Sequence, residues 1–173
     1  MKLIGKKSMM NMRRLFYTLF ILGTTLSVLS SCKDSVVYDQ YSHIPIAGWE
    51  KNDTLKFEIP PLENGGYYQE QLGLRITGAY PFMGLTLIVE QTIFHEGKNL
   101  EEKTEKVDTI QCDLIDKNGV TKGQGISYYQ YDVPINIYRM NANDSILLSV
   151  RHDMKREILP GISDIGIKMT KHP

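Results

Sequence analysis

The sequence predicts an all-β protein, a β-sandwich of about seven to eight mainly antiparallel strands in an immunoglobulin-like or jelly-roll-like arrangement. Apolar residues recur at every second position in seven short stretches, and residues typical of turns separate these stretches. No stretch keeps the 3.6-residue period of an amphipathic helix over three turns. Because strands with one apolar face must bury it, two packed sheets are the simplest solution, and a partly closed barrel is the alternative.

The first three expected strands cover residues 55–59, 71–77 and 85–94. Pro60-Pro61 ends the first of them. Their apolar faces are formed, in order, by Leu55, Phe57 and Ile59; by Leu72, Leu74 and Ile76; and by Leu85, Leu87, Val89 and Ile93.

The last four expected strands cover residues 110–114, 129–137, 146–150 and 165–169. The longest has tyrosines at 129 and 131 on its apolar face, so we expect both rings in the core. Turn-rich connections separate the seven strands at 64–66, 95–105, 118–119, 123–125, 141–144 and 160–161.

The N-terminal segment has the layout of a bacterial lipoprotein signal peptide. Five basic residues and no acidic ones precede an apolar run over residues 15–28. This run is too short to span a bilayer comfortably. The run ends in Leu29-Ser30-Ser31-Cys32, which resembles a lipobox. We therefore expect removal of residues 1–31 and lipidation of Cys32, with palmitate among the acyl chains. The alternative is an uncleaved membrane helix with a chance cysteine.

After that cysteine we expect a tether and then one domain. Residues 32–48 are interpreted as the lipidated cysteine and tether, within a polar, irregular stretch over 33–53, and residues 49–173 as a single β-sandwich domain. The signal holds 5 of the 20 basic residues, so the remainder has 15 basic and 20 acidic residues and a net charge of −5. This balance argues against nucleic acid as a partner. With Cys32 lipidated, Cys112 has no disulfide partner and is expected as a small buried hydrophobe, a reactive thiol being the alternative.

Catalytic patterns are missing from the sequence. It contains neither H-E-x-x-H nor G-x-S-x-G, and Gly123-Gln124-Gly125 is a lone G-x-G without a following helix. The four histidines, His43, His95, His152 and His172, lie far apart, and His95 and His172 are expected in solvent. We therefore predict no catalytic residues, no metal and no cofactor.

Aromatic residues offer a possible contact surface for a glycan or a partner. The candidates are Trp49, Tyr67, Tyr68 and Tyr128. Trp49 would either plug one end of the sandwich or line a site, and at least one ring of the Tyr67-Tyr68 pair should be exposed. Stacked exposed rings would favour a carbohydrate-binding surface.

A recurring Asp, hydroxyl, aliphatic pattern resembles the O-glycosylation acceptor of secreted Bacteroidetes proteins. Its hydroxyl residues are Ser35, Thr54, Thr109 and Ser145. The alternative is structural, because Asp-Ser and Asp-Thr favour turns that open strands.

Several segments in fixed order resemble one known family. They are Ile46–Leu55, Leu72–Ile76, Tyr80-Pro81-Phe82, Asp116-Lys117-Asn118-Gly119, Arg156–Ile162 and Asp164–Ile167. Together they resemble the GldH family of gliding-motility lipoproteins of the Bacteroidetes, over nearly the whole chain after Cys32.

The resemblance implies a lipoprotein associated with the outer membrane and linked to the gliding apparatus, whose components overlap with type IX secretion. The family has no established catalytic residues, and relatives occur in bacteria that do not glide. The leading hypothesis is therefore a non-enzymatic component that contacts other envelope or motility proteins, through its tether and exposed sheet edges. The alternative is a glycan-binding outer-membrane lipoprotein. Periplasmic or surface orientation stays open.

Overall fold

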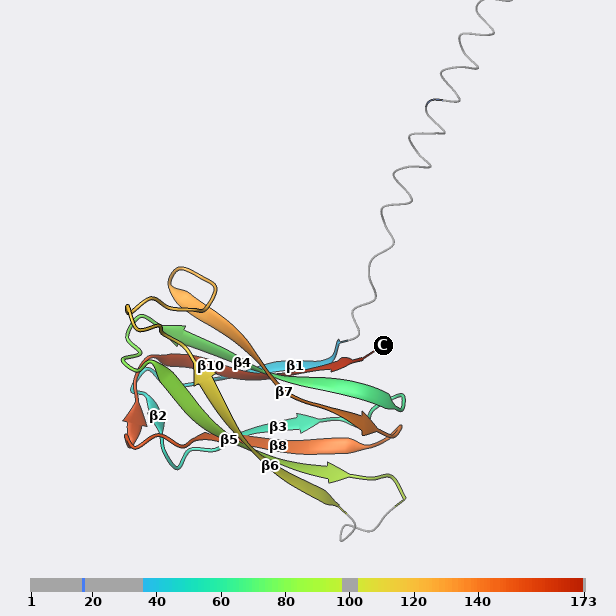
Figure 1. The fold of residues 1–173 in the computed structure, drawn as a ribbon. Helices are drawn as coiled ribbons and strands as arrows, with labels where there is room; N and C mark the ends of the chain where they lie inside the picture. Colours follow the sequence, from blue (N-terminus) through green and yellow to red (C-terminus); the bar gives the residue numbers. More distant parts are fainter. Residues whose placement is uncertain (1–16, 18–35, 98–102, 173) are drawn as a thin grey trace, which may run out of the picture. The chain divides into compact units, whose positions relative to one another are not determined.

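The computed structural model describes Tyr17 and residues 36–97 and 103–172 (Figure 1). Contacts between residues divide the chain into two units, 1–34 and 35–173. In the described part of the second unit, all regular secondary structure consists of β-strands joined by turns and loops. The all-β prediction is therefore confirmed.

Two four-stranded antiparallel sheets make up the second unit. The first sheet has the order β1-β10-β4-β7 and the second β3-β8-β5-β6. The strands of the first are β1 (Val36–His43), β10 (Ile162–Lys171), β4 (Gly66–Thr77) and β7 (Tyr128–Met140). Those of the second are β3 (Leu55–Ile59), β8 (Ser145–His152), β5 (Gly84–Phe94) and β6 (Thr104–Asp113). A small third sheet pairs β2 (Trp49–Glu50) with β9 (Ile158–Leu159).

The pairing of the eight long strands is that of a jelly roll. The first pairs with the last, the second with the seventh, the third with the sixth and the fourth with the fifth, as β1·β10, β3·β8, β4·β7 and β5·β6. A long antiparallel hairpin rolled into two layers gives this order. Of the two arrangements the sequence allows, the structure has the jelly-roll one.

The core lies between the two sheets and consists of the alternating residues that the sequence indicates. Leu72, Leu74 and Ile76 of β4 are fully buried, as are Leu87 and Val89 of β5. All seven predicted strands are present, with ends shifted by a few residues. The largest shift is in β6, which begins at Thr104 instead of 110.

One long strand, β1, was missed. Residues 36–43 lie within the expected tether but pair with β10 from Val36↔Thr170 to His43↔Asp164. The tether interpretation is therefore wrong for these residues. The reason is that β1 is an edge strand in which Tyr38 alone is buried, so it shows no apolar alternation. Backbone hydrogen bonds to β10 hold β1 in place, and such bonds leave no periodic pattern in the sequence.

Two glycines in neighbouring strands of the first sheet make room for one tyrosine ring. Gly73 and Gly166 pair with each other, and a Cβ on either would come within 2.6 Å of Tyr41. The guanidinium of Arg75 lies 4.1 Å from the centroid of the same ring, and Gln130 Nε2 donates to its hydroxyl at 2.9 Å. Two of the segments that carry the family resemblance, around Gly73 and Gly166, therefore meet in one packing arrangement.

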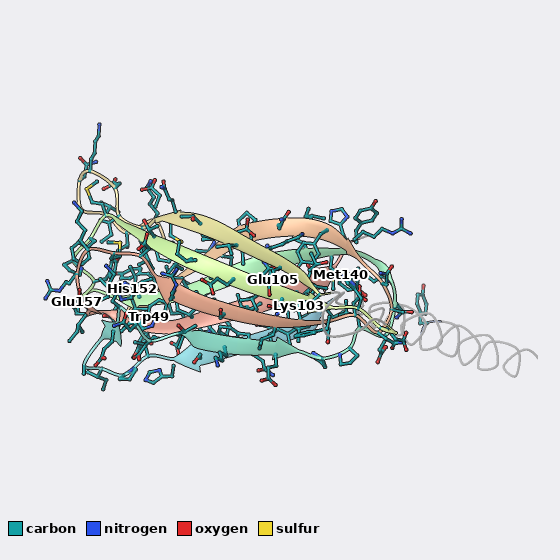
Figure 2. All side chains as sticks on the ribbon, turned by 90° about the horizontal axis from the view of Figure 1, so that it is seen from below. Trp49, Lys103, Glu105, Met140, His152 and Glu157 are labelled. Carbon is teal, nitrogen blue, oxygen red and sulfur yellow. The ribbon has the colours of Figure 1, made fainter. Side chains whose placement is uncertain are left out.

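The strand directions define two ends of the sandwich. At the near end, β1 begins, β10 finishes, and connections 60–65 and 141–144 turn. At the far end lie connections 44–54, 78–83, 114–127 and 153–161. Figure 2 shows Trp49, His152 and Glu157 at the far end, and Lys103, Glu105 and Met140 at the near end.

Candidate functional site

Two of the four aromatic candidates are buried inside the sandwich. Trp49 is 1% exposed; its indole Nε1–H donates to the Asp53 carbonyl at 3.0 Å, and its ring meets His152 edge-on at 5.3 Å between centroids (Figure 2). Tyr68 is also 1% exposed, and its hydroxyl donates to the Asn64 carbonyl at 2.5 Å. Trp49 thus closes the far end, and neither ring is available to a ligand on the surface.

The other two aromatic candidates are exposed but lie far apart. Tyr67 and Tyr128 are each 56% exposed. Tyr128 pairs with Thr77, ten residues along β4 from Tyr67, which corresponds to about 33 Å. The structure therefore does not bring the four residues together into a platform of rings.

The hydroxyl residues of the recurring Asp pattern have different surroundings. Thr54 is exposed directly before β3, Thr109 is exposed in the middle of β6, and Ser145 is half-buried as the first residue of β8. Ser35 and the lipobox Cys32 lie outside the described residues. Of the three acceptors that the structure describes, Thr54 and Thr109 are thus the two open to a modifying enzyme.

The histidines and the Cys112 thiol show no reactive arrangement among the described residues. His152 is fully buried, and this burial lowers its pKa. His43 contacts Asp164 at 3.2 Å, and His95 is half-buried with Nδ1 3.1 Å from Asp144 Oδ1, so the expectation of a solvated His95 is wrong. Burial raises the pKa of the Cys112 thiol to about 11, which agrees with a buried hydrophobe. Across residues 36–97 and 103–172, no three His, Cys, Asp or Glu side chains form a group suited to a metal ion.

A buried polar cluster inside the sandwich was missed. Glu70 of β4 is fully buried, and its Oε2 accepts from Gln91 Nε2 at 2.8 Å. The hydroxyl of Tyr138 lies 3.2 Å from both Glu70 Oε2 and Gln91 Oε1. Burial is the main reason that the pKa of Glu70 is raised to about 7, with the charge of Asp108 acting in the same direction.

The sequence does contain a signal for this cluster. Glu70 is in phase with the apolar residues 72, 74 and 76 of its strand, and Gln91 is in phase with residues 85, 87, 89 and 93. A polar residue on the apolar face of a strand predicts a buried polar group that needs a hydrogen-bond partner. Because Glu70 is enclosed, the cluster is part of the core and not a surface site.

The four edge strands of the two large sheets each carry a feature that disfavours addition of another strand. β3 is short and followed by Pro60-Pro61, β7 contains Pro134 and a register shift, and β1 has a register shift after Val36. In β6, the charged residues Lys106 and Asp108 point toward the interior, alternating with the exposed residues 105, 107 and 109. Prolines, bulges and inward-pointing charges are known protections of sheet edges. The edges are therefore poorer candidates for partner binding than the sequence suggests.

The far end has a recess between connections 78–83 and 114–127. Its volume is about 510 Å³, and it is lined by Phe82, Met83, Ile115 and Tyr129, among others, with Asp116 and Lys117 beside them. A second recess of about 600 Å³ shares Phe82 and is bordered by residues 153–156. Four of the six segments that carry the family resemblance lie in the far-end connections. Segments that are distant in the sequence therefore line these recesses together at the far end.

Comparison with known proteins identifies the family. The model of the GldH lipoprotein family matches residues 36–169. The gliding motility lipoprotein GldH of Flavobacterium johnsoniae is 28% identical over 159 residues, which cover 86% of this chain and 93% of that protein. The gliding motility lipoprotein GldH homolog of Christiangramia forsetii is 25% identical over 169 residues, which cover 90% and 96%.

Solved structures add little to this. An aminopeptidase from a marine sediment Thaumarchaeota archaeon matches with a TM-score of 0.34 and 10% identity, over 81% of this chain and 31% of that one. The Eiger TNF of S. frugiperda matches with a TM-score of 0.31 and 9% identity, over 80% and 94%. Scores this low carry no argument about function. The family match, in contrast, begins with the first strand of the sandwich and extends into the last: this chain belongs to the GldH lipoprotein family.

Proposed function

We propose that this GldH-family protein is held at the outer membrane by acyl chains on Cys32 and is a non-enzymatic accessory or structural component of the gliding or secretion apparatus. The observation that carries the proposal is the family match over the whole sandwich, combined with the lipobox Leu29-Ser30-Ser31-Cys32. One acyl chain gives marginal membrane binding, whereas two or more give stable anchoring. Among the described residues, no helix is long and apolar enough to cross a membrane.

The surroundings of the titratable groups support a non-enzymatic role. Glu70, His152 and Cys112 are buried, each held by packing or hydrogen bonds. Glu58 and Glu90 are exposed on strands of the second sheet, and Glu90 contacts Arg151 at 3.5 Å. Catalysis by carboxylates would need a pair held at a fixed separation around a substrate.

Glycan binding by the four aromatic residues has less support. Two of the rings are buried, and about 33 Å separates the other two. A protein partner in the envelope is therefore the interaction we propose.

Replacing the lipobox cysteine tests the anchor. We expect Cys32→Ser to leave an unprocessed precursor or a protein that no longer sediments with outer membranes. Cys112→Ser is the matched control, because this thiol is buried in the sandwich and should not affect sorting. Normal fractionation of Cys32→Ser would overturn the anchoring proposal.

Crosslinking tests the role in the apparatus. The natively expressed protein is crosslinked mildly in outer membranes, isolated and analysed by mass spectrometry. We expect a recurrent set of motility, secretion or other envelope proteins. Recovery of none from an anchored protein would contradict a role in the apparatus and make a polysaccharide array the next measurement.

O-glycosylation at Thr54 and Thr109 is a separate proposal that rests on the sequence pattern and the exposure of both residues. The intact mass of the protein purified from its own host should exceed that of the unmodified chain by one or more glycans. A Thr54→Val, Thr109→Val double variant should lose that excess. An unmodified mass for the native protein would refute the proposal.

A further inference from the structure

The far end carries the most exposed apolar side chains of the described part of the sandwich. Ile46 is 99% exposed and Ile126 91% exposed, and each comes from a different connection. Val120, Met83, Tyr128 and Ile158 add exposed apolar surface at the same end. Exposed apolar patches on a folded protein are typical of interaction sites.

The connections that present these side chains are ordered by their own hydrogen bonds. In the 114–127 connection, Asp116 Oδ1 accepts the backbone N–H groups of Asn118 at 2.8 Å and Val120 at 2.9 Å. Gln124 and Gln130 exchange backbone hydrogen bonds at 3.0 and 2.9 Å on either side of Ile126. Surfaces that are ordered before binding lose less conformational entropy when a partner docks.

The connection that carries Ile46 is fixed in a similar way. The Gly48 N–H donates to the Pro45 carbonyl at 2.9 Å, and the next residue is the buried Trp49. Gly48 has a φ of +114°, and a Cβ there would come within 2.5 Å of Ile158, so glycine is required. Ile46 is therefore held out into solvent by a well-packed base.

The recess beside Phe82 gives this surface a place for an anchoring side chain. Interfaces obtain much of their binding energy from a few large side chains seated in apolar pockets. The recess is lined by Phe82, Met83, Ile115 and Tyr129, and its volume of about 510 Å³ accommodates an aromatic or large aliphatic side chain.

The charges at the far end favour a protein over a lipid surface. The basic residues of its four connections are Lys51, Lys117, Lys122, Lys155 and Arg156, and the acidic residues are Glu50, Asp53, Asp116, Asp153 and Glu157. These balance, whereas the chain from residue 32 onward has a net charge of −5. Loops that enter anionic membranes carry an excess of basic residues, and protein interfaces have an apolar centre with a polar rim of both signs.

The position of the far end relative to the anchor leads to the same conclusion. The four residues from Cys32 to Val36 span at most about 14 Å. The twelve residues of β4 place the far end about 40 Å from the end at which β1 begins. In a sandwich that stands on its anchored end, the near end is close to the membrane and these loop tips lie about 40 Å from it.

We propose that the far end is a docking surface for an envelope protein that inserts an aromatic or aliphatic side chain beside Phe82 and surrounds it with charges of both signs. If the sandwich stands on its anchored end, the partner contacts the end that faces away from the anchoring membrane. This inference rests on the anchor proposed above, and it names the surface through which the protein joins its apparatus.

Site-specific photocrosslinking in the native host tests the surface. A photoreactive phenylalanine analogue replaces Ile126, Val120 or Val107 in otherwise complete, lipidated protein. Val107, 67% exposed on edge strand β6, is the matched control for docking through a sheet edge. We expect the same protein to be crosslinked from positions 126 and 120 and not from 107.

Charge substitutions make the result specific. Ile46→Glu and Met83→Glu should each lower the crosslink yield from position 126 at least tenfold. Ile137→Glu, at an exposed position of β7, is the control and should leave the yield unchanged. The partner identified by mass spectrometry, once purified, should bind the wild-type chain at least tenfold more tightly than Ile46→Glu. Unchanged yields with both charged variants would overturn the proposal.

The identity of the crosslinked molecule distinguishes an envelope protein from other occupants of this surface. Crosslinks to phospholipid would identify the surface as a membrane contact, crosslinks to a second copy would identify a dimer interface, and either overturns the proposal. No crosslink from positions 126 and 120 in a protein that fractionates with the outer membrane also overturns it. If the protein does not fractionate with membranes, the proposed anchor is refuted. The crosslink yields of the charged variants then test the docking surface independently of the anchor.

Discussion

The two ends of the sandwich differ in how much apolar surface their connections expose. At the near end, neighbouring connections are bonded to each other: the Leu62 N–H donates to the Asp144 carbonyl at 3.0 Å, and the Asn143 N–H donates to the Leu62 carbonyl at 2.7 Å. His95 and Asp144 are in contact at 3.1 Å across the same end. At the far end, connections are also bonded to each other, as in the β2·β9 pair and the bond of 2.8 Å from the Leu114 N–H to the Met83 carbonyl. Their tips at Ile46 and Ile126 nevertheless extend into solvent.

This difference indicates that the near end mainly stabilises the fold, whereas the far end also offers a surface for recognition. Bonds between connections close a sandwich and resist unfolding, whereas loop tips that extend beyond those bonds can present side chains to a partner. The near end is also the end at which β1 begins, four residues after Cys32. Substitutions at the two ends test this division through their effects on the free energy of unfolding.

The largest effect is expected from Trp49, the buried base of the far end. Trp49→Ala removes a ring that is 1% exposed and leaves a cavity, which should lower the free energy of unfolding by about 4 kcal/mol. Trp49→Phe, which loses mainly the hydrogen bond to the Asp53 carbonyl, is the control and should cost about 1 kcal/mol. Urea unfolding measures both. A cost below about 1 kcal/mol for Trp49→Ala would show that the far end is not closed by this residue.

Glu70, in the half of β4 nearer the near end, should make stability depend on pH. Its pKa is about 7 when folded, against an ordinary value of 4.5, so the folded state binds more protons between these values. Its contribution is therefore fully present below about pH 4.5 and is lost as pH rises through 7, a change of about 3 kcal/mol.

The isosteric Glu70→Gln variant isolates that contribution. It should remove this part of the pH dependence and be more stable than the wild-type chain at pH 8, because a neutral amide replaces a buried carboxylate. Glu58→Gln, on the exposed face of β3, is the control. Equal slopes of unfolding free energy against pH for Glu70→Gln and the wild-type chain would refute the assignment.

A moderate effect is expected from Asp144, which joins the connections of the near end. Asp144→Ala removes the acceptor of the Asn141 N–H at 2.9 Å and the contact with His95, and should cost about 2 kcal/mol. Asp116→Ala is the far-end counterpart and should mainly accelerate hydrogen exchange at residues 118 and 120, with a smaller loss of global stability. Equal global losses in the two variants would remove the distinction between the ends.

The sequence predicts the sandwich well because burial has a period in strands. Seven strands follow from alternating residues such as Leu72, Leu74 and Ile76, whereas β1 has Tyr38 alone in the interior and therefore leaves no pattern. The choice between jelly roll and immunoglobulin order depends on which strands pair across long separations. The alternation within each strand does not contain that information.

The candidate site was less accessible to prediction from sequence. Glu70 and Gln91 could have been found, since each stands in phase with apolar neighbours. The far end could not, because Ile46, Met83 and Ile126 belong to connections that come together only after the sheets have formed. In a sequence, an isoleucine in a connection looks the same whether its side chain is buried or 99% exposed.

The smallest effect on stability is expected at the exposed tips of the far end, Ile46 and Ile126. Ile46→Ser and Ile126→Ser should each change the free energy of unfolding by less than about 0.5 kcal/mol, because side chains in solvent contribute little to the folded state. Both variants should nevertheless bind less of a hydrophobic dye and self-associate less in light scattering, because they remove apolar surface that water must hydrate. Ile44→Ser, two residues away but 2% exposed, should behave in the opposite way and cost several kcal/mol. If Ile46→Ser destabilises the chain as strongly as Ile44→Ser does, then Ile46 is part of the core and is not available to bind a partner.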